Sequence, residues 1–234
     1  MYVINGKRVL FIFVSLIISF ISFFSFNKNE SIMTSSLPIS NKLIILDAGH
    51  GYPDEGAISK DGTSESSINL DIVLKLQGLL EQSGCEVILT RSDENGIYDA
   101  NSNSIKEKKI SDLKNRVNLI NKSNADLLVS IHLNKFSECK FSGWQTFYRK
   151  KDDLSKNLAI SIQKNLNLSI QKENKREALS IENKYIIDKT SIPISIVECG
   201  FLSNEEEANL LKTDEYQQKI AWGIYTGIMD YLEF

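Results

Sequence analysis

The spacing of apolar side chains predicts a regular alternation of strands and helices from residue 42 to the C-terminus. Short, continuous apolar runs are typical of strands that are covered on both faces of a sheet. Such runs predict strands at 43–46, 87–89, 127–131 and 194–197, and weaker patterns predict an edge strand at 143–148 and a further strand at 185–187. The chain therefore offers about six strands.

Between these strands, apolar residues recur every three or four positions, which is the period of an amphipathic helix. The segment 66–83 shows this pattern clearly, with Ile68, Ile72 and Leu76 on one face. The other predicted helices span 113–121, 154–168, 204–212 and 215–232, whereas 92–110 is polar and without a period and is predicted to be a long surface loop. The alternation predicts the α/β class, with a mostly parallel twisted sheet of about six strands and helices on both faces.

The most apolar stretch of the sequence lies near its N-terminus. Residues 9–26 carry no charge and follow the basic pair Lys7 and Arg8, which places the start of the chain in the cytoplasm. The run contains no pair of small residues that would mark a cleavage site, so a retained signal-anchor is favoured over a cleaved signal peptide. We therefore expect a signal-anchor or signal peptide at 1–26, a Ser- and Asn-rich linker at 27–41 and an extracytoplasmic domain at 42–234.

Charge and cysteine content exclude further classes. The 27 basic and 30 acidic residues give a net charge of −3 without a block of like charges, so nucleic acid is not an expected partner. The three cysteines, Cys85, Cys139 and Cys199, are odd in number and irregularly spaced. A disulfide framework is therefore not expected, and at most one pair could form.

The chain contains only two histidines, and both lie next to predicted strands. His50 follows the strand at 43–46, and His132 follows the strand at 127–131. Because ligands bind at the carboxyl ends of strands in open α/β sheets, we expect both imidazoles in one shared site. Two imidazoles and one carboxylate are the donors of a catalytic zinc ion that keeps a position for water.

Glu65 is the best candidate for this carboxylate, because it stands at the start of the helix predicted at 66–83. A carboxylate is also favoured there by the helix dipole alone, so a purely structural role stays open. Asp47, Asp54 and Glu55 are competitors in the same region. Glycines between 49 and 56 fit a loop whose backbone approaches a metal or a substrate closely.

If water bound at such a zinc site attacks an amide, a base must take the proton of the water and later supply it to the leaving nitrogen. Glu198 is placed for this role, because it follows the apolar strand at 194–197 on the same edge of the sheet. Adjacent side chains on a strand point to opposite faces, so Cys199 should face the core if Glu198 faces the site.

Several separated motifs together resemble the zinc-dependent N-acetylmuramoyl-L-alanine amidases. They are LDAGHG at 46–51, GA at 56–57, GTSE at 62–65, Arg116 with Asn121 and the AD pair at 125–126, SIHLN at 130–134, and VECGFLSN at 197–204. The resemblance implies a phosphorylase/hydrolase-like fold, one zinc ion on His50, Glu65 and His132, and Glu198 as the catalytic carboxylate. It also implies hydrolysis of the amide between N-acetylmuramic acid and L-alanine in peptidoglycan. Tyr52 departs from the pattern, since many members have glycine there.

A lone catalytic domain behind one apolar segment is most similar to the spore-cortex amidases, which prepare muramic acid for δ-lactam formation. The segment would tether the enzyme to the membrane, and an activating protein could dock on the loop at 92–110. Two alternatives stay open: a zinc carboxypeptidase, which requires an arginine to receive a terminal carboxylate, and a non-catalytic, membrane-tethered wall-binding module.

Overall fold

The computed structural model describes residues 41–233, so the N-terminal segment and nearly all of the linker lie outside the described residues. One six-stranded sheet has the order β2-β1-β3-β6-β4-β5. The strands are β1 Leu43–Ala48, β2 Glu86–Leu89, β3 Leu127–Asn134, β4 Gln145–Arg149, β5 Leu179–Ile181 and β6 Ile194–Phe201. Only the β4–β6 pair is antiparallel among these strands, which confirms the predicted mostly parallel sheet.

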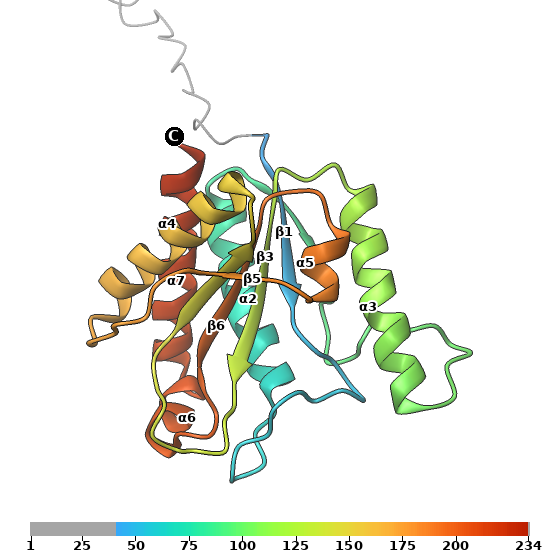
Figure 1. Cartoon of the computed structure of the whole chain (residues 1–234), viewed down its shortest axis with the longest axis horizontal. Coiled ribbons are helices and arrows are strands. Elements are labelled where there is room, and N and C mark those ends of the chain that lie inside the picture. Colours follow the sequence, from blue (N-terminus) through green and yellow to red (C-terminus); the bar gives the residue numbers. More distant parts are fainter. Residues whose placement is uncertain (1–40, 234) are drawn as a thin grey trace, which may run out of the picture. The chain divides into compact units, whose positions relative to one another are not determined.

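Helices cover both faces of the sheet. They are α2 Glu65–Gln82, α3 Ile105–Lys122, α4 Asp153–Ile170, α5 Tyr185–Lys189, α6 Glu205–Leu211 and α7 Asp214–Leu232. Helices α2, α4 and α7 bury one face, and α3 and α5 bury the other; α3 and α4 stand at opposite sides of the view in Figure 1. Among residues 41–233, no helix has the length and apolar character needed to cross a membrane.

Strand β3 shows how the two faces differ. Val129 and Ile131 point into the large core under α2, α4 and α7, whereas Leu128 points into the smaller core under α3 and α5. Side chains alternate along a strand, so Ser130 and His132 share the face of Leu128. The second face therefore turns from apolar to polar before the strand ends.

A β-bulge lies between β3 and β6, next to this polar end. His132 pairs with Glu198 and Asn134 pairs with Phe201, so two steps along β3 match three steps along β6. The extra residue in β6 returns Phe201 to the same face as Glu198. His132, Glu198 and Phe201 therefore stand on one face of the sheet, at its carboxyl edge.

The prediction of a loop at 92–110 is wrong for residues 105–110, because α3 begins at Ile105. A capping box starts the helix: Glu107 N donates to the Ser104 side chain, and the Glu107 carboxylate accepts from Ser104 N. Only four residues of α3 are buried, so the apolar period that would predict its first turns is missing. The Ser-x-x-Glu spacing was the available signal.

The region around β4 also differs from the prediction. Residues 185–187, predicted as a strand, form the first part of α5, which buries the adjacent side chains of Ile186 and Ile187 in the smaller core. The three-residue strand β5 was not predicted, because it is short and mostly exposed. Since β5 covers its outer side, β4 is not the edge strand that the sequence suggested.

Candidate metal centre

The three predicted metal ligands come together at the carboxyl edge of the sheet. His50 lies in the loop after β1, His132 lies in β3, and Glu65 is the first residue of α2. Glu65 Oε1 is 3.3 Å from His50 Nε2 and 3.0 Å from His132 Nδ1, and one donor atom from each residue lies within 4.8 Å of the others. Tetrahedral zinc with bonds of about 2.0–2.1 Å places its donors about 3.3 Å apart, so this donor set fits zinc.

Two glycines make the close approach of these side chains possible. A Cβ atom on Gly49 would lie 2.3 Å from Cε1 of His132. A Cβ on Gly56, whose φ is +69°, would lie 2.6 Å from Glu65 Oε2 and 2.7 Å from the His50 ring. Any larger residue would therefore push the ligands apart, which explains the predicted need for glycine in this loop.

Glu65 is held as an ionised carboxylate. Its side chain is almost fully buried; Oε1 accepts from Leu133 N and Oε2 accepts from Ala57 N. Burial alone would raise its pKa, but hydrogen bonds and charge interactions with His132 and His50 outweigh burial and keep the pKa well below its usual range. The carboxylate is thus ready to bind a cation.

Asp54 orients His50 rather than joining the three donors. Its Oδ2 lies 3.0 Å from His50 Nδ1, and its Oδ1 forms a 2.7 Å ion pair with Lys109 of α3. Burial tends to lower the pKa of His50, but hydrogen bonds to Asp54 and Glu65 raise it to about 9. A carboxylate on the second ring nitrogen is the usual partner of a metal-binding histidine.

Asp47 and Glu55, the other two candidates for the carboxylate ligand, do not join the metal-binding group. Asp47 is buried and accepts hydrogen bonds from Arg116, Ser130 and Thr90. Burial works to raise the pKa of Asp47, but Arg116 and Ser130 lower it to about 2. Glu55 is exposed.

Two buried arginines fix the loop that carries His50. Arg116 donates to the carbonyl oxygens of Ala48 and His50, and Arg91 donates to those of Ala48 and Gly49. Arg116 was among the residues of the family resemblance, but the sequence reasoning missed Arg91. Its position two residues after the strand predicted at 87–89 was the signal that could have indicated it.

Glu198 stands beside His132 across the β3–β6 pair, on the same face of the sheet. Its Oε2 is buried and has no hydrogen-bond partner among the described residues. Burial raises the pKa of this carboxyl group, as does the Glu65 charge, against the opposing effect of His132. Cys199 is fully buried in the large core, as predicted from the alternation of side chains. Glu198 is therefore available for proton transfer.

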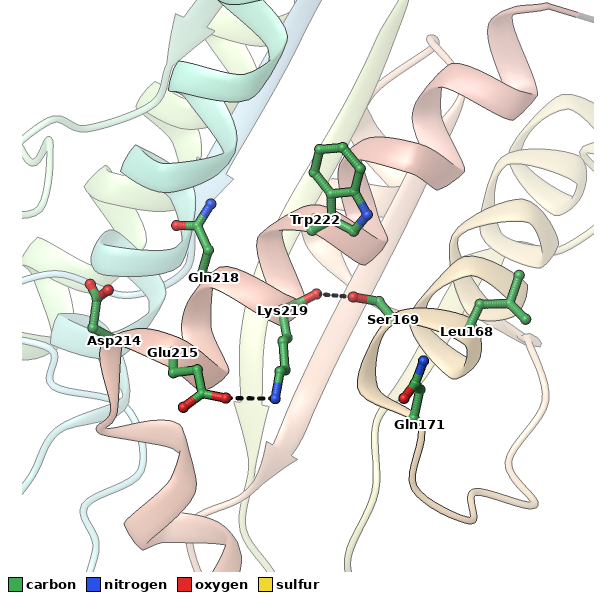
Figure 2. A pocket seen from close by; sticks show the side chains of 8 residues that line it. All are labelled: Leu168, Ser169, Gln171, Asp214, Glu215, Gln218, Lys219 and Trp222. Carbon is green, nitrogen blue, oxygen red and sulfur yellow. Dashed lines mark hydrogen bonds and ion pairs between the residues drawn. The ribbon is translucent and has the colours of Figure 1, made fainter.

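A different hollow, of about 870 Å³, lies over α4 and α7 (Figure 2). There, Lys219 forms an ion pair with Glu215, and its carbonyl oxygen accepts from Ser169 Oγ. None of the predicted site residues lines this hollow. The charges of Lys219 and Glu215 are already paired with each other, so the candidate chemistry stays at the edge of the sheet.

Comparisons with known proteins agree with this geometry. Residues 44–230 match the family model described as N-acetylmuramoyl-L-alanine amidase. The germination-specific N-acetylmuramoyl-L-alanine amidase of Bacillus subtilis is 36% identical over 225 residues, which cover 96% of this chain and 94% of the relative.

Solved structures are similar as well. The CwlD amidase of Clostridioides difficile, in complex with the GerS lipoprotein, shows 49% identity and a TM-score of 0.80, covering 82% of this chain and 99% of that chain. The catalytic domain of CwlV, an N-acetylmuramoyl-L-alanine amidase from Bacillus (Paenibacillus) polymyxa, shows 30% identity and a TM-score of 0.71, with coverage of 82% and 98%.

Proposed function

The chain belongs to the N-acetylmuramoyl-L-alanine amidase family and is an enzyme of this class, and we propose that its reaction depends on one zinc ion held by His50, Glu65 and His132. The observation that carries the proposal is the meeting of the only two histidines with a buried, ionised carboxylate. This family assignment favours the amidase over the carboxypeptidase and the wall-binding module.

The residues of the chain divide the work of amide hydrolysis. Zinc, when bound, supplies a Lewis acid that polarises the amide carbonyl and acidifies water. Glu198 takes the proton from water and returns it to the leaving nitrogen, for which its unpartnered oxygen and raised pKa suit it. Asp54 fixes the ring of His50, while Arg91 and Arg116 hold the backbone on either side of Gly49.

Zinc content tests the ligand assignment. We expect about one zinc per purified chain, and the double variant His50→Ala/His132→Ala should lose it and all turnover, because only one of three protein donors remains. Cys139→Ser is the control, since Cys139 is an exposed possible donor outside the site. A double variant that still binds one zinc per chain would contradict the assignment.

The reaction itself is tested on isolated peptidoglycan. Mass spectrometry of treated peptidoglycan should show release of whole stem peptides.

We further propose a role in maturation of the spore cortex. Support comes from the name of the Bacillus subtilis relative, whose similarity extends over nearly the full length of both chains. Deletion of the gene should remove muramic δ-lactam from cortex peptidoglycan and impair germination. Normal δ-lactam content after deletion would assign the enzyme to another wall substrate.

The domain boundaries and the anchor are proposals as well: a signal-anchor or signal peptide at 1–26, a linker at 27–41 and a catalytic domain at 42–234. The start of the domain is supported by Asp126, which accepts from Lys42 Nζ and from Leu43 N. A shortened chain that begins at Lys42 should fold and stay soluble. The N-terminal peptide of the native protein, measured by mass spectrometry, distinguishes a retained anchor from a cleaved signal.

An accessory protein is proposed by analogy with the CwlD amidase, which was solved together with a lipoprotein. The segment 92–110 is a suitable docking place, because Lys109 at its end contacts Asp54 and thereby His50. We expect turnover by the purified chain to rise when the partner is added. Equal turnover with and without it would remove this proposal and leave the amidase assignment intact.

A further inference from the structure

Arg176 contacts Gln145, the strand partner of Glu198, on the face of the sheet that carries Glu198. Gln145 of β4 pairs directly with Glu198 of β6, and directly opposed residues point to the same face. Arg176 Nη1 donates to Gln145 Oε1 at 3.1 Å, and its guanidinium carbon lies 4.8 Å from the ring centre of Phe201. Because the bulge turns Phe201 toward this face too, two neighbours of Glu198 fix the position of the guanidinium.

Arg176 forms no ion pair with a described carboxylate; among the described acids its charge acts on Glu207, whose pKa burial raises against hydrogen bonds from Gly143 and Phe201 and the charges of Lys172 and Arg176. Its Nε donates to Ser142 O, so its contacts are an amide oxygen, a backbone carbonyl and an aromatic ring, and no described carboxylate lies within ion-pair distance. The side chain is partly exposed, and Nη2 makes no hydrogen bond to a described residue. By contrast, Arg116 and Arg149 pair with aspartates.

A guanidinium held in this way is suited to a carboxylate, because its planar donors match the two oxygens. The position of Glu198 indicates which part of the substrate lies nearby. Glu198 protonates the leaving nitrogen, so the L-alanine that carries this nitrogen must lie next to it. The next residue of the stem peptide then lies toward Gln145 and Arg176. In peptidoglycan that residue is a glutamate joined through its side chain, which leaves its α-carboxyl group either free or amidated.

We propose that Arg176 binds the free α-carboxylate of this second stem residue, and that it makes the enzyme prefer peptides in which this group is not amidated. The inference rests on the amidase activity and on the proposed role of Glu198 as the group that protonates the leaving nitrogen. It assigns the peptide side of the substrate to the β4 side of the site, and the sugar side to the region of His50.

A matched pair of substrates tests the proposal. The compounds are muramoyl-L-alanyl-D-isoglutamate and muramoyl-L-alanyl-D-isoglutamine, which differ only in the carboxylate. A charge-assisted bidentate contact predicts that the native enzyme has a kcat/KM about 10- to 100-fold higher for the carboxylate, mainly through KM. Arg176→Met should abolish this preference, and Arg176→Lys should keep part of it. Lys175→Met removes the same charge one residue away and should leave the preference unchanged.

Three results would overturn the proposal: equal use of both substrates by the native enzyme, a preference that survives in Arg176→Met, or a preference that Lys175→Met also removes. Calorimetry with the product L-alanyl-D-isoglutamate gives a readout without turnover, and binding should weaken in Arg176→Met but not in Lys175→Met. Failure of the native enzyme to cleave either compound would count against the proposed mechanism, while the calorimetry still decides the role of Arg176. Release of single terminal residues would instead assign Arg176 the role expected in a carboxypeptidase.

Discussion

The two faces of the sheet differ in how far their apolar cores extend. Under α2, α4 and α7 the core extends to Leu133, near the carboxyl end of β3, and to Leu202, directly after β6. Under α3 and α5 it ends at Leu128 of β3 and Ile196 of β6. Beyond that limit the second face carries the polar row of His132, Glu198 and Gln145. The comparison teaches that one face stabilises the fold while the end of the other is left free for chemistry.

The boundary between the smaller core and the polar row is itself polar and buried. Asp47 and Ser130 pair across β1 and β3, and Arg116 reaches both Asp47 and the His50 carbonyl. A buried ion pair adds little net stability, but loss of one partner leaves an uncompensated charge. The pair Asp47–Arg116 therefore links the stability of this face to the position of the metal ligands.

The largest expected effect is a loss of activity without a loss of stability, caused by a substitution on the polar face. Glu198→Gln should lower kcat by about 10²–10⁴-fold, because an amide cannot accept the proton from water. Zinc content and the free energy of unfolding should stay near the native values, since Glu198 contributes no hydrogen bond through its buried Oε2. Kinetics, metal analysis and denaturant unfolding measure these three quantities. Loss of zinc together with activity would make Glu198 a ligand.

The pH profile of the native enzyme checks the same role. The base must be ionised, so kcat should fall as the pH drops through the pKa of Glu198, which burial raises above the usual range of a glutamate. Zinc bound at each pH must be measured alongside, because protonation of the imidazoles also releases the metal. A profile that follows zinc content alone would contradict the assignment of this limb to Glu198.

A substitution under the opposite face should reverse this pattern. Leu76→Ala in α2 removes a fully buried side chain and should lower the free energy of unfolding by about 2–5 kcal/mol, while kcat per folded molecule stays unchanged. Leu74→Ala is the matched control on the same helix, because Leu74 is 42% exposed and should change stability little. A large loss of kcat in Leu76→Ala would show that the two faces are coupled.

The same difference between faces explains what the sequence could predict. Strands β1, β3 and β6 are continuous apolar runs, and α2 and α7 bury one clear stripe, so periodicity identified them. The start of α3, the short α5 and β5 lie on the thinner or more exposed side of the molecule, where burial imposes no such period.

Within the site, the two histidines and two glutamates could be chosen because strand ends and a helix start bring them to one edge. The residues that orient and support these four could not be predicted from the sequence. Asp54 was considered only as a ligand, because sequence spacing does not show that its carboxylate meets the second nitrogen of His50. Arg176 reaches Gln145 from a segment without regular structure, 31 residues away, so no periodic pattern connects them.

The smallest expected effect concerns this partner of His50 and tests how far the polar face depends on α3. Asp54→Asn should weaken zinc binding by about 10–100-fold, because the amide is a poorer acceptor for the ring N–H that fixes the imidazole. Lys109→Met should weaken it less, since Asp54 keeps its bond to His50 and also accepts from Gly56 N. Lys108→Met is the control, because Lys108 lies over the Tyr98 ring and does not contact Asp54. Zinc affinity measured by competition with a chelator, without substrate, gives the order. If Asp54→Asn binds zinc as tightly as the native protein, the metal site does not depend on its connection to α3, and the polar face is organised by the sheet and the two buried arginines alone.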